Sequence, residues 1–323
     1  MKKISLVAAV AASVVLSFAA QAQQPFPSRP ITWVVGFAPG GGMDSVTRLV
    51  AAKVSQNIGQ SIVIENKPGA STIIAAQYVA QAAPDGYTIW SAEQGGLVFN
   101  SALFSKLPYD TARDFTPVTN MIQAPLVLAV NPGFAAMDLR QLIAMAKKDP
   151  GKFSYGTPGR GAFHHLGMEA FKERAGVDIT DIQYKGIAPA MQDALAGQIP
   201  IVSTDTAVAL PSLRSGKLRG LATFSKARLP VTPDIPSFAE LGFPDLDMAP
   251  IVGVMAPKAT PRDIVARLNT EIVRALKDPA VNGRLSGLGL TVIGDTPEQF
   301  SAFLDAEAKR WLPLIRKLNF KLD

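Results

Sequence analysis

The feature that most constrains the fold of this chain is a regular alternation of short apolar runs with segments of helical periodicity. Residues 30–37 form a β-branched apolar run that is long enough for a buried strand. Apolar residues from 46 to 54 then follow the spacing of one helix face. Gly59 closes that helix, and residues 62–64 begin the next strand. This alternation predicts an α/β fold in which mainly parallel sheets carry helices on both faces.

The same alternation continues along the rest of the chain. Further strands are expected at residues 87–90, 126–130 and 153–155. Further helices are expected at residues 73–82, 139–148, 164–175, 189–196, 261–276 and 297–318. A length of 323 residues suits two domains of about 150 residues each, and a hydrophobic content of 48% allows both of them to bury a core.

The N-terminal residues have the pattern of a cleaved signal peptide. Met1-Lys2-Lys3 is a short basic region, and residues 4–20 carry no charge. Ala20-Gln21-Ala22 supplies the small-x-small cleavage pattern, so the mature chain is expected to begin at Gln23. The alternative is an uncleaved membrane anchor, for which this uncharged run is shorter than the span of about 20 residues that a bilayer requires. The pattern therefore predicts export to the periplasm, with residues 1–22 removed.

Residue types exclude much common chemistry. Cysteine is absent, which excludes disulfide scaffolds, zinc–thiolate sites, iron–sulfur clusters and thiol catalysis. The two histidines are adjacent at His164 and His165, and this argues against a multi-histidine metal centre. No metal and no cofactor is expected.

The basic residues indicate no nucleic-acid partner. The formal net charge is +6, of which Lys2 and Lys3 belong to the signal peptide, so the mature chain carries about +4. Lysine and arginine are scattered with no run longer than two, as on solvated helix faces. A mild positive field would attract small anions.

Two glycine-rich loops lie where a predicted strand is followed by a predicted helix. The first, Ala38–Gly42, is followed by Met43-Asp44 and so lacks the Lys-Ser/Thr of a P-loop and the spacing of a dinucleotide-binding loop. The second spans Gly156–Gly161. Glycine at such turns often has only a steric role, but backbone N–H groups at a helix start also attract anions. The pair suits a small ligand with a carboxylate at one or both ends.

Nucleophilic catalysis finds little support in the sequence. No G-x-S-x-G elbow occurs, and the two histidines lie at a predicted helix start rather than beside an evident serine and acid. His165 is expected to pack or to cap the helix rather than to catalyse. We therefore expect no enzyme activity. A hydrolase or lyase is the least favoured alternative.

A series of ordered motifs runs along essentially the whole mature chain. They are Gly36–Gly42 with Asp44, Glu65–Ala70, Pro84–Thr88, Leu107–Asp110 with Asp114-Phe115, Gly159–Gly161 with His165-Leu166, Tyr184–Gly186, Gly197-Gln198, Ser215–Arg219, Ala239–Gly242 and Ala256-Pro257. In this order they resemble the Bug-type solute-binding receptors of tripartite tricarboxylate transporters. The resemblance implies a two-lobed periplasmic binding protein that holds its ligand between the lobes.

The same resemblance implies a division of the chain between the lobes. The first lobe would comprise residues 23–125 and 231–323, and the second residues 126–230. The chain would cross between them near residues 124–130 and 224–231.

The resemblance also implies that backbone N–H groups and bridging waters hold the ligand carboxylate. The implied contacts are Phe37, Ala38, Pro39, Gly40, Gly41, Gly42 and Asp44 in the first loop, Ser91, Glu93 and Gly95 after the strand at 87–90, Thr157, Gly159, Gly161 and Ala162 in the second lobe, and Thr204 and Asp205 in the remaining wall at 201–205.

Several of these positions depart from the usual family pattern. Ala162 stands where a serine or threonine is usual, and Pro200 where an aspartate is usual. Ser203-Thr204 replaces a common Phe-Asp. These substitutions remove polar side chains that could bind a carboxylate, while aromatic residues lie nearby, so they favour a bulkier, aromatic carboxylate as the ligand. The alternative is that the substitutions are neutral changes at positions that only line the site. The aromatic residues are Trp90, Phe99 and Phe163.

Glu93 lies where a small hydroxyl residue is common in the family. An ionised Glu93 about 4 Å from a ligand carboxylate would repel it by roughly 4 kcal/mol at an effective dielectric near 20. We therefore expect Glu93 to turn aside or to pair with a neighbour. The alternatives are that Glu93 is neutralised or that the ligand presents a hydrogen-bond donor to it.

The function implied by the resemblance is a periplasmic receptor that binds a small organic acid, aromatic or dicarboxylic, and delivers it to integral-membrane permease subunits. We expect the receptor to be a monomer. The alternative from another class is a ligand-sensing partner of a membrane signalling receptor.

Overall fold

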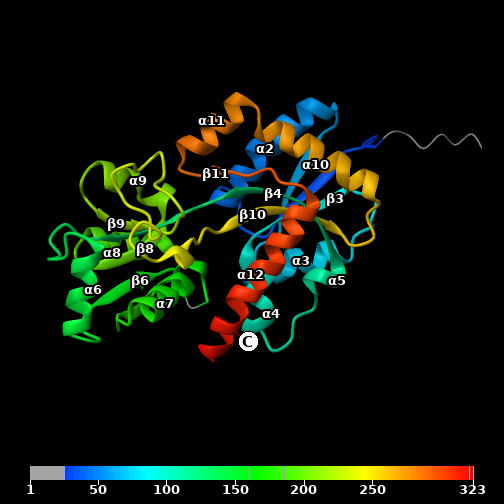
Figure 1. Cartoon of the computed structure of the whole chain (residues 1–323). Coiled ribbons are helices and arrows are strands. Elements are labelled where there is room, and N and C mark those ends of the chain that lie inside the picture. The colour runs from blue at the N-terminus through cyan, green and yellow to red at the C-terminus, as the bar shows by residue number, and fades with distance from the viewer. Residues whose placement is uncertain (1–25, 160, 185, 320, 323) are drawn as a thin grey trace, which may run out of the picture.

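The computed structural model describes residues 26–159, 161–184, 186–319 and 321–322, so the expected signal peptide lies outside the described residues. Two sheets flanked by helices form two lobes (Figure 1). The elements around the first sheet are β1 (Ile31–Val35), α2 (Gly42–Ile58), β2 (Ile62–Asn66), η1 (Ala70–Thr72), α3 (Ile73–Ala80), β3 (Thr88–Ala92), η2 (Gly95–Phe99), α4 (Asn100–Leu103), α5 (Thr111–Asp114), β4 (Phe115–Gln123), β10 (Ile251–Pro257), α10 (Arg262–Leu276), α11 (Pro279–Gly287), β11 (Thr291–Val292) and α12 (Pro297–Lys317). The elements around the second sheet are β5 (Leu126–Val130), α6 (Leu139–Lys148), β6 (Ser154–Thr157), α7 (Phe163–Ala175), β7 (Thr180–Gln183), α8 (Ile187–Leu195), β8 (Ile201–Asp205), α9 (Thr206–Arg214), β9 (Arg219–Thr223) and η3 (Pro244–Leu246).

The expected strands and helices are confirmed, with bounds that shift by a few residues. Strand β4 and helix α9 are among the elements that were not expected, and each contains a proline that interrupts the pattern. Pro117 lies within β4 and Pro211 within α9. No helix in the described ranges combines the length and the apolar character that a membrane crossing needs.

The α/β class is confirmed, but the expectation of mainly parallel sheets is wrong, because both sheets are mixed. The first has the order β11-β4-β10-β3-β1-β2, and the second has the order β7-β6-β8-β5-β9. Strand β1 is parallel to β2 and β3, and β6 is parallel to β7 and β8. Strand β10 is antiparallel to β3 and β4, and β5 is antiparallel to β8 and β9. The antiparallel strands flank the two crossings, where the outgoing and returning chain run side by side in opposite directions.

The first crossing lies within the expected range, whereas the second comes later than expected. The chain leaves the first sheet after β4 and enters β5 at Leu126. Residues 224–231 do not return it, because Phe238 N–H still donates to Thr223 O at 2.9 Å and Met248 N–H to Phe224 O at 3.2 Å. Ala124 N–H donates to Pro250 O at 2.8 Å, so the two crossings touch there and the return comes near residue 250.

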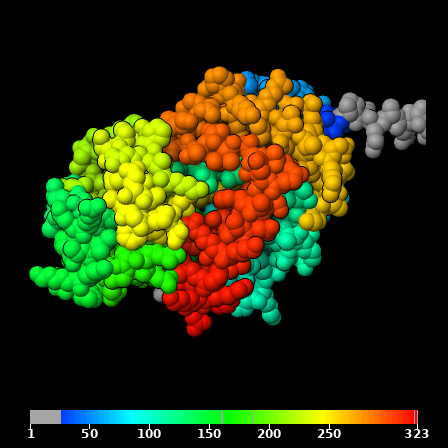
Figure 2. Space-filling view, in the orientation of Figure 1, coloured from blue at the N-terminus to red at the C-terminus, as the bar shows by residue number. Residues whose placement is uncertain are grey.

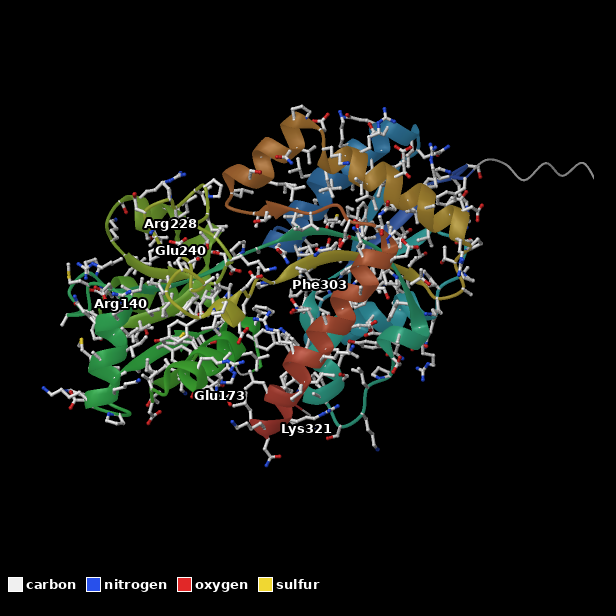
Figure 3. All side chains as sticks on the ribbon, in the orientation of Figure 1. Arg140, Glu173, Arg228, Glu240, Phe303 and Lys321 are labelled. Atoms are coloured by element: carbon white, nitrogen blue, oxygen red, sulfur yellow. The ribbon has the colours of Figure 1, made fainter. Side chains whose placement is uncertain are left out.

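Aromatic packing explains why residues 224–248 stay on the second lobe. The rings of Phe224 and Phe238 lie 4.4 Å apart between centroids, and Phe171 of α7 packs on Phe238 at 5.3 Å. Within the same segment, Arg228 Nε pairs with Glu240 Oε2 at 2.9 Å, and both side chains lie on the second lobe in Figure 3. This segment therefore adds an apolar layer to the second lobe before the chain crosses back.

The C-terminal helix α12 belongs to the first lobe but also contacts the second. Phe163, the first residue of α7, packs on Phe99 at 5.6 Å and on Trp311 of α12 at 5.3 Å between ring centroids. The space-filling view shows α12, in red, against the green surface of the second lobe (Figure 2). The apolar core therefore continues from one lobe into the other at Phe163.

Candidate ligand-binding site

The helices that follow the parallel strands begin without a hydrogen bond from a capping side chain. This holds in the described chain for α2 after β1, α3 after β2, α7 after β6, α8 after β7 and α9 after β8. Helix α10 also lacks such a cap, whereas side chains cap α5, α6, α11 and α12. Uncapped first turns leave backbone N–H groups and the positive end of the helix dipole available to an anion. Ligands of open α/β sheets bind at this end of the strands.

We call the strand-to-helix junctions of the two lobes the strand-end face. It comprises residues 36–44, 70–72, 91–96, 157–159, 161–165 and 203–206. The two halves of this face meet where Phe163 stacks on Phe99, because Phe163 directly follows the loop after β6 and Phe99 closes η2. The predicted contact residues of the first lobe therefore lie on one side of the Phe163–Phe99 contact, and those of the second lobe lie on the other side.

The first glycine loop is exposed, and the buried side chain of Asp44 stabilises it through a hydrogen bond. Residues 37–42 are exposed, whereas Asp44 is buried. The Asp44 carboxylate accepts hydrogen bonds from Gly40 N–H at 2.8 Å, Arg48 Nε at 2.9 Å and Asn66 Nδ2 at 2.8 Å. The hydrogen bond from Arg48, with those from Gly40 and Asn66, lowers the pKa of Asp44 to about 2 against the opposing effect of burial. Asp44 therefore shapes the loop, and the accessible part of the loop is the backbone of residues 37–42.

Glu93 pairs with backbone N–H groups of its own loop. Its carboxylate accepts hydrogen bonds from Gly95 N–H at 2.6 Å and Gly96 N–H at 2.9 Å, at the start of η2. The expectation that it pairs with a neighbour is confirmed, although the partner is backbone rather than a basic side chain. Burial raises the pKa of Glu93, and the two backbone hydrogen bonds only partly oppose that shift. Ser91 is fully buried, and its hydroxyl lies 2.8 Å from Thr47 Oγ1.

A strained turn at residues 70–72 lies in the strand-end face and is not predicted by the sequence. Ala70, Ser71 and Thr72 have φ values of 45°, 49° and 67°, a left-handed conformation that is rare for residues other than glycine. Asn100 Nδ2 holds the turn by donating to Ser71 O at 2.9 Å. Backbone strain of this kind is concentrated at ligand sites, so the turn belongs with the candidate residues. The sequence does not predict this turn, because alanine, serine and threonine rarely adopt a positive φ.

In the second lobe the two histidines fix the loop and the wall. Gly161 N–H, in the loop before α7, donates to His165 Nδ1 at 3.3 Å. His165 is buried, as expected of a packed residue, and it holds this loop rather than capping the first turn of α7. His164, whose role the sequence leaves open, has Nε2 at 3.2 Å from Asp205 Oδ2 and so joins α7 to the end of β8. Burial alone would raise the pKa of Asp205, but the charge and hydrogen bond of His164 hold it below its usual range. Asp205 is therefore engaged within the lobe.

Four hydroxyl groups near the strand ends of the second lobe are buried without a hydrogen-bond partner. They belong to Thr157, Ser203, Thr204 and Thr206. Thr157 and Ser203 continue the parallel register that pairs Gly156 of β6 with Val202 of β8. Because most buried hydroxyls in proteins find a partner, such a cluster at the strand ends marks unused hydrogen-bonding capacity. Ala162 directly precedes α7 and supplies no hydroxyl cap, as expected for an alanine.

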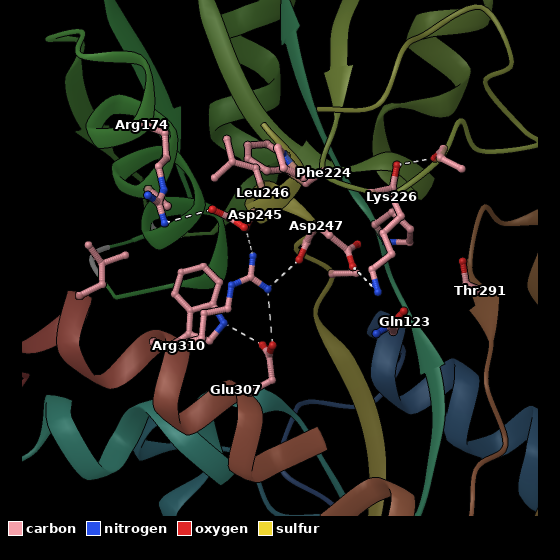
Figure 4. Close-up of a pocket in the computed structure, with 18 of the residues that line it drawn as sticks. Gln123, Arg174, Phe224, Lys226, Asp245, Leu246, Asp247, Thr291, Glu307 and Arg310 are labelled. Carbon is pink, nitrogen blue, oxygen red and sulfur yellow. Dashed lines mark hydrogen bonds and ion pairs between the residues drawn. The ribbon is translucent and has the colours of Figure 1, made fainter. Parts of the chain in front are cut away.

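A large cleft lies elsewhere in the described part of the chain. It has a volume of about 1070 Å³, runs between α7, residues 224–249 and α12, and contains none of the predicted contact residues. We call it the α7–α12 cleft, and it is the hollow between the yellow and the red surfaces in Figure 2. Arg310 spans it by donating to Asp247 O at 2.8 Å and to Asp245 O, as Figure 4 shows.

Every charged side chain that lines the α7–α12 cleft forms an ion pair. The pairs are Arg174–Asp245, Lys226–Asp247, Arg228–Glu240, Arg310–Glu307 and Lys317–Glu173. Most of these side chains are substantially exposed, so each pair stabilises the fold by a small amount. The cleft therefore offers little free charge to a ligand despite its volume.

Two mixed α/β lobes that are joined by adjacent crossings, with open helix starts at the strand ends, define a two-lobed solute-binding protein. The model of the tripartite tricarboxylate transporter family receptor matches residues 46–320. Protein BugT of Bordetella pertussis is 36% identical over 298 residues, which cover 92% of this chain and 91% of BugT. The chain therefore belongs to the tripartite tricarboxylate transporter receptor family and is a solute-binding receptor rather than an enzyme.

Solved structures agree with this assignment. The Rhodopseudomonas palustris protein MatC with bound malate is 34% identical, with a TM-score of 0.76 over 90% of this chain and 100% of MatC. The R. palustris protein Rpa4515 with adipate is 35% identical, with a TM-score of 0.79 over 90% of this chain and 97% of Rpa4515.

Proposed function

We propose that this chain captures a small organic carboxylate at the strand-end face and delivers it to integral-membrane permease subunits from the periplasm. The observation that carries the proposal is the set of uncapped helix starts at the ends of the parallel strands in both lobes. These turns can bind a carboxylate through backbone N–H groups at little steric cost. Export with cleavage after Ala22 and a monomeric receptor are parts of the same proposal.

The proposed contacts are the exposed first loop with its adjoining turn in one lobe, and the glycine loop with the strand-end hydroxyls in the other. In the first lobe they are the backbone of Phe37, Ala38, Pro39, Gly40, Gly41 and Gly42, with Glu93 and Gly95 on the adjoining turn. In the second lobe they are Thr157, Gly159, Gly161, Ala162 and Thr204. Asp44, Ser91 and Asp205 position these contact residues, since each is already hydrogen-bonded within its lobe.

An aliphatic acid fits the proposal better than an aromatic one. Trp90 and Phe99 are almost fully buried, and Phe163 is only 8% exposed. Phe99 and Phe163 stack on one another and so connect the lobes, and Trp90 packs on Phe115 within the first lobe. These contacts leave the rings little surface for a ligand. The relatives solved with malate and adipate support an aliphatic dicarboxylic acid in this chain.

The test is a binding screen of the mature chain. A thermal-shift series over aliphatic and aromatic mono- and dicarboxylates should identify at least one acid that raises the melting temperature, because a ligand that binds only the native state stabilises it. Calorimetry should then give one site per chain, and the recovered acid should be chemically unchanged. Absence of any shift across the series would overturn the proposal.

Delivery to a permease needs a test in cells. Deletion of the gene should abolish uptake of the labelled acid found in the screen. If uptake is normal and only the transcriptional response to that acid is lost, the sensing alternative replaces transport.

A further inference from the structure

Three segments of the first lobe converge on the side chain of Thr72. A Cβ atom on Gly36, after β1, would lie 2.9 Å from Thr72 Cβ, and one on Gly96, in η2, would lie 2.5 Å from Thr72 Oγ1. Glycine is therefore required at both positions if Thr72 is to keep its place. The chain holds Thr72 in a left-handed conformation that a β-branched residue rarely adopts. Local packing thus fixes a strained residue at the junction of three strand ends.

The Thr72 hydroxyl has no partner in this arrangement. Thr72 is the residue before α3, where a threonine side chain commonly accepts a hydrogen bond from the first turn, yet it makes no such bond. Its Oγ1 atom is buried without a hydrogen-bond partner, and the residue is only 3% exposed. A strained backbone that positions an unpaired hydroxyl is more readily explained by a ligand than by folding alone.

The Glu93 carboxylate and the Thr72 hydroxyl both lie beside Gly96. Gly96 N–H donates to Glu93 Oε1, while the α-carbon of Gly96 faces the Thr72 hydroxyl. Both carboxylate oxygens accept one backbone hydrogen bond each, which leaves acceptor positions free on both. None of the ion pairs found among the described residues includes Glu93. An ionised Glu93 would repel a ligand carboxylate at this place, whereas a hydroxyl or ammonium group would find an acceptor.

We propose that Glu93 and Thr72 form an acceptor subsite that takes the hydroxyl or ammonium group of a substituted aliphatic acid. The carboxylates of that acid would bind the uncapped starts of α2 and α7, and the subsite would select the substituent. The inference rests on the proposed function, since it assigns a ligand class to the same face. Thr72 and Glu93 are in this account the residues that determine specificity.

Two matched series of acids test the subsite. Succinate, malate and aspartate share one four-carbon skeleton, and glutarate, 2-hydroxyglutarate and glutamate share one five-carbon skeleton. Calorimetry on the mature chain should show at least tenfold tighter binding of a hydroxylated or aminated acid than of its unsubstituted parent. Comparison of the hydroxylated with the aminated acid then tells which donor the subsite takes.

Three variants connect that preference to the two residues. Glu93→Gln keeps the size of the side chain and removes its charge, and it should reduce the preference at least tenfold while the parent acid binds as well or better. Thr72→Val should reduce the preference severalfold, and Thr72→Ser should retain it. Glu298→Gln, in the first turn of α12, is the control and should change nothing. Circular dichroism and thermal unfolding check that each variant folds.

The possible failures can be distinguished from one another. Equal affinity for substituted and parent acids, or an unchanged preference in Glu93→Gln, overturns the subsite and leaves the receptor function intact. So does a failure of all six acids when other carboxylates bind in the wider screen. If no carboxylate binds at all, the receptor proposal itself fails.

Discussion

The strand-end face and the α7–α12 cleft use their polar groups in opposite ways. At the strand ends, helices begin uncapped and the hydroxyls of Thr72, Thr157 and Thr204 are buried without partners. In the cleft, every charged lining side chain forms an ion pair. The cleft has a volume of about 1070 Å³, but the strand-end face has the free hydrogen-bonding capacity. Unused capacity is therefore a better guide to a ligand site here than volume.

The side chains of the adjacent residues Glu93 and Gln94 form hydrogen bonds in different regions, one within the strand-end face and the other with a residue that lines the α7–α12 cleft. Glu93 turns to the first N–H groups of η2, and Gln94 Nε2 donates to Glu307 of α12, which also accepts from Trp311 Nε1 at 2.7 Å. The same short loop therefore contributes an acceptor to the strand-end face and a structural bond to the base of the cleft.

The largest effect is expected where the two regions meet. Phe163→Ala removes the ring that packs on Phe99 and Trp311, so the free energy of unfolding should fall by about 3 kcal/mol. Phe134→Ala, at a half-buried ring that contacts Phe153, is the control and should lose markedly less. Urea unfolding measures both. Equal losses would mean that the lobes do not depend on the Phe163 contact.

The next effect concerns the loop above Asp44. Because the pKa of Asp44 is depressed to about 2, its ionised form stabilises the fold by about 2 kcal/mol at neutral pH. That contribution is complete above about pH 5 and is lost as the pH falls through 4 towards 2. Asp44→Asn should therefore be less stable by about 2 kcal/mol at pH 7, and the difference should narrow towards pH 2. A difference that is independent of pH in urea unfolding would show that the Asp44 charge does not hold the loop.

A smaller effect separates binding from folding at the first loop. Gly41 has φ −72° and a Cβ there would lie 3.5 Å from Ala38 O, so Gly41→Leu should fold normally. Its side chain would shield the backbone N–H groups of the loop, and affinity for the acid should fall at least tenfold, about 1.4 kcal/mol. Gly283→Leu, in α11 with open space around it, should bind like the unmodified chain. Unchanged affinity in Gly41→Leu removes this loop from the site.

The smallest effect is expected in the cleft. Arg310→Met keeps most of the side-chain length but removes the bonds to Asp245, Asp247 and Glu307. We expect a loss of about 1 kcal/mol in unfolding free energy and a change in affinity below twofold, measured by urea unfolding and calorimetry. A tenfold loss of affinity in a folded variant would bring the cleft into the ligand site.

The sequence predicts the features of this fold that depend on local pattern. The run at 30–37 and the apolar face from 46 to 54 give β1 and α2, because a strand period and a helix period are visible within one segment. The antiparallel β10 and the late return near residue 250 depend on contacts with distant strands and on the Phe224–Phe238 packing. No local pattern encodes those contacts.

The candidate site divides in the same way. The exposed backbone of residues 37–42 follows from glycine spacing, whereas the inward carboxylate of Asp44 depends on Asn66, which lies on another strand. The role of Thr72 is hidden because neither its positive φ nor its close packing against Gly36 and Gly96 follows from its residue type. Side-chain direction and backbone strain thus arise from tertiary contacts that sequence periodicity does not report.

The most direct test of the account is a crystal structure of the mature chain with the acid that gives the largest thermal shift. The account predicts that the acid lies between the lobes at the strand-end face, with a carboxylate within hydrogen-bond distance of the first-turn N–H groups of α2 or α7. An acid bound in the α7–α12 cleft, with the first turns of α2 and α7 in contact only with water, would contradict it.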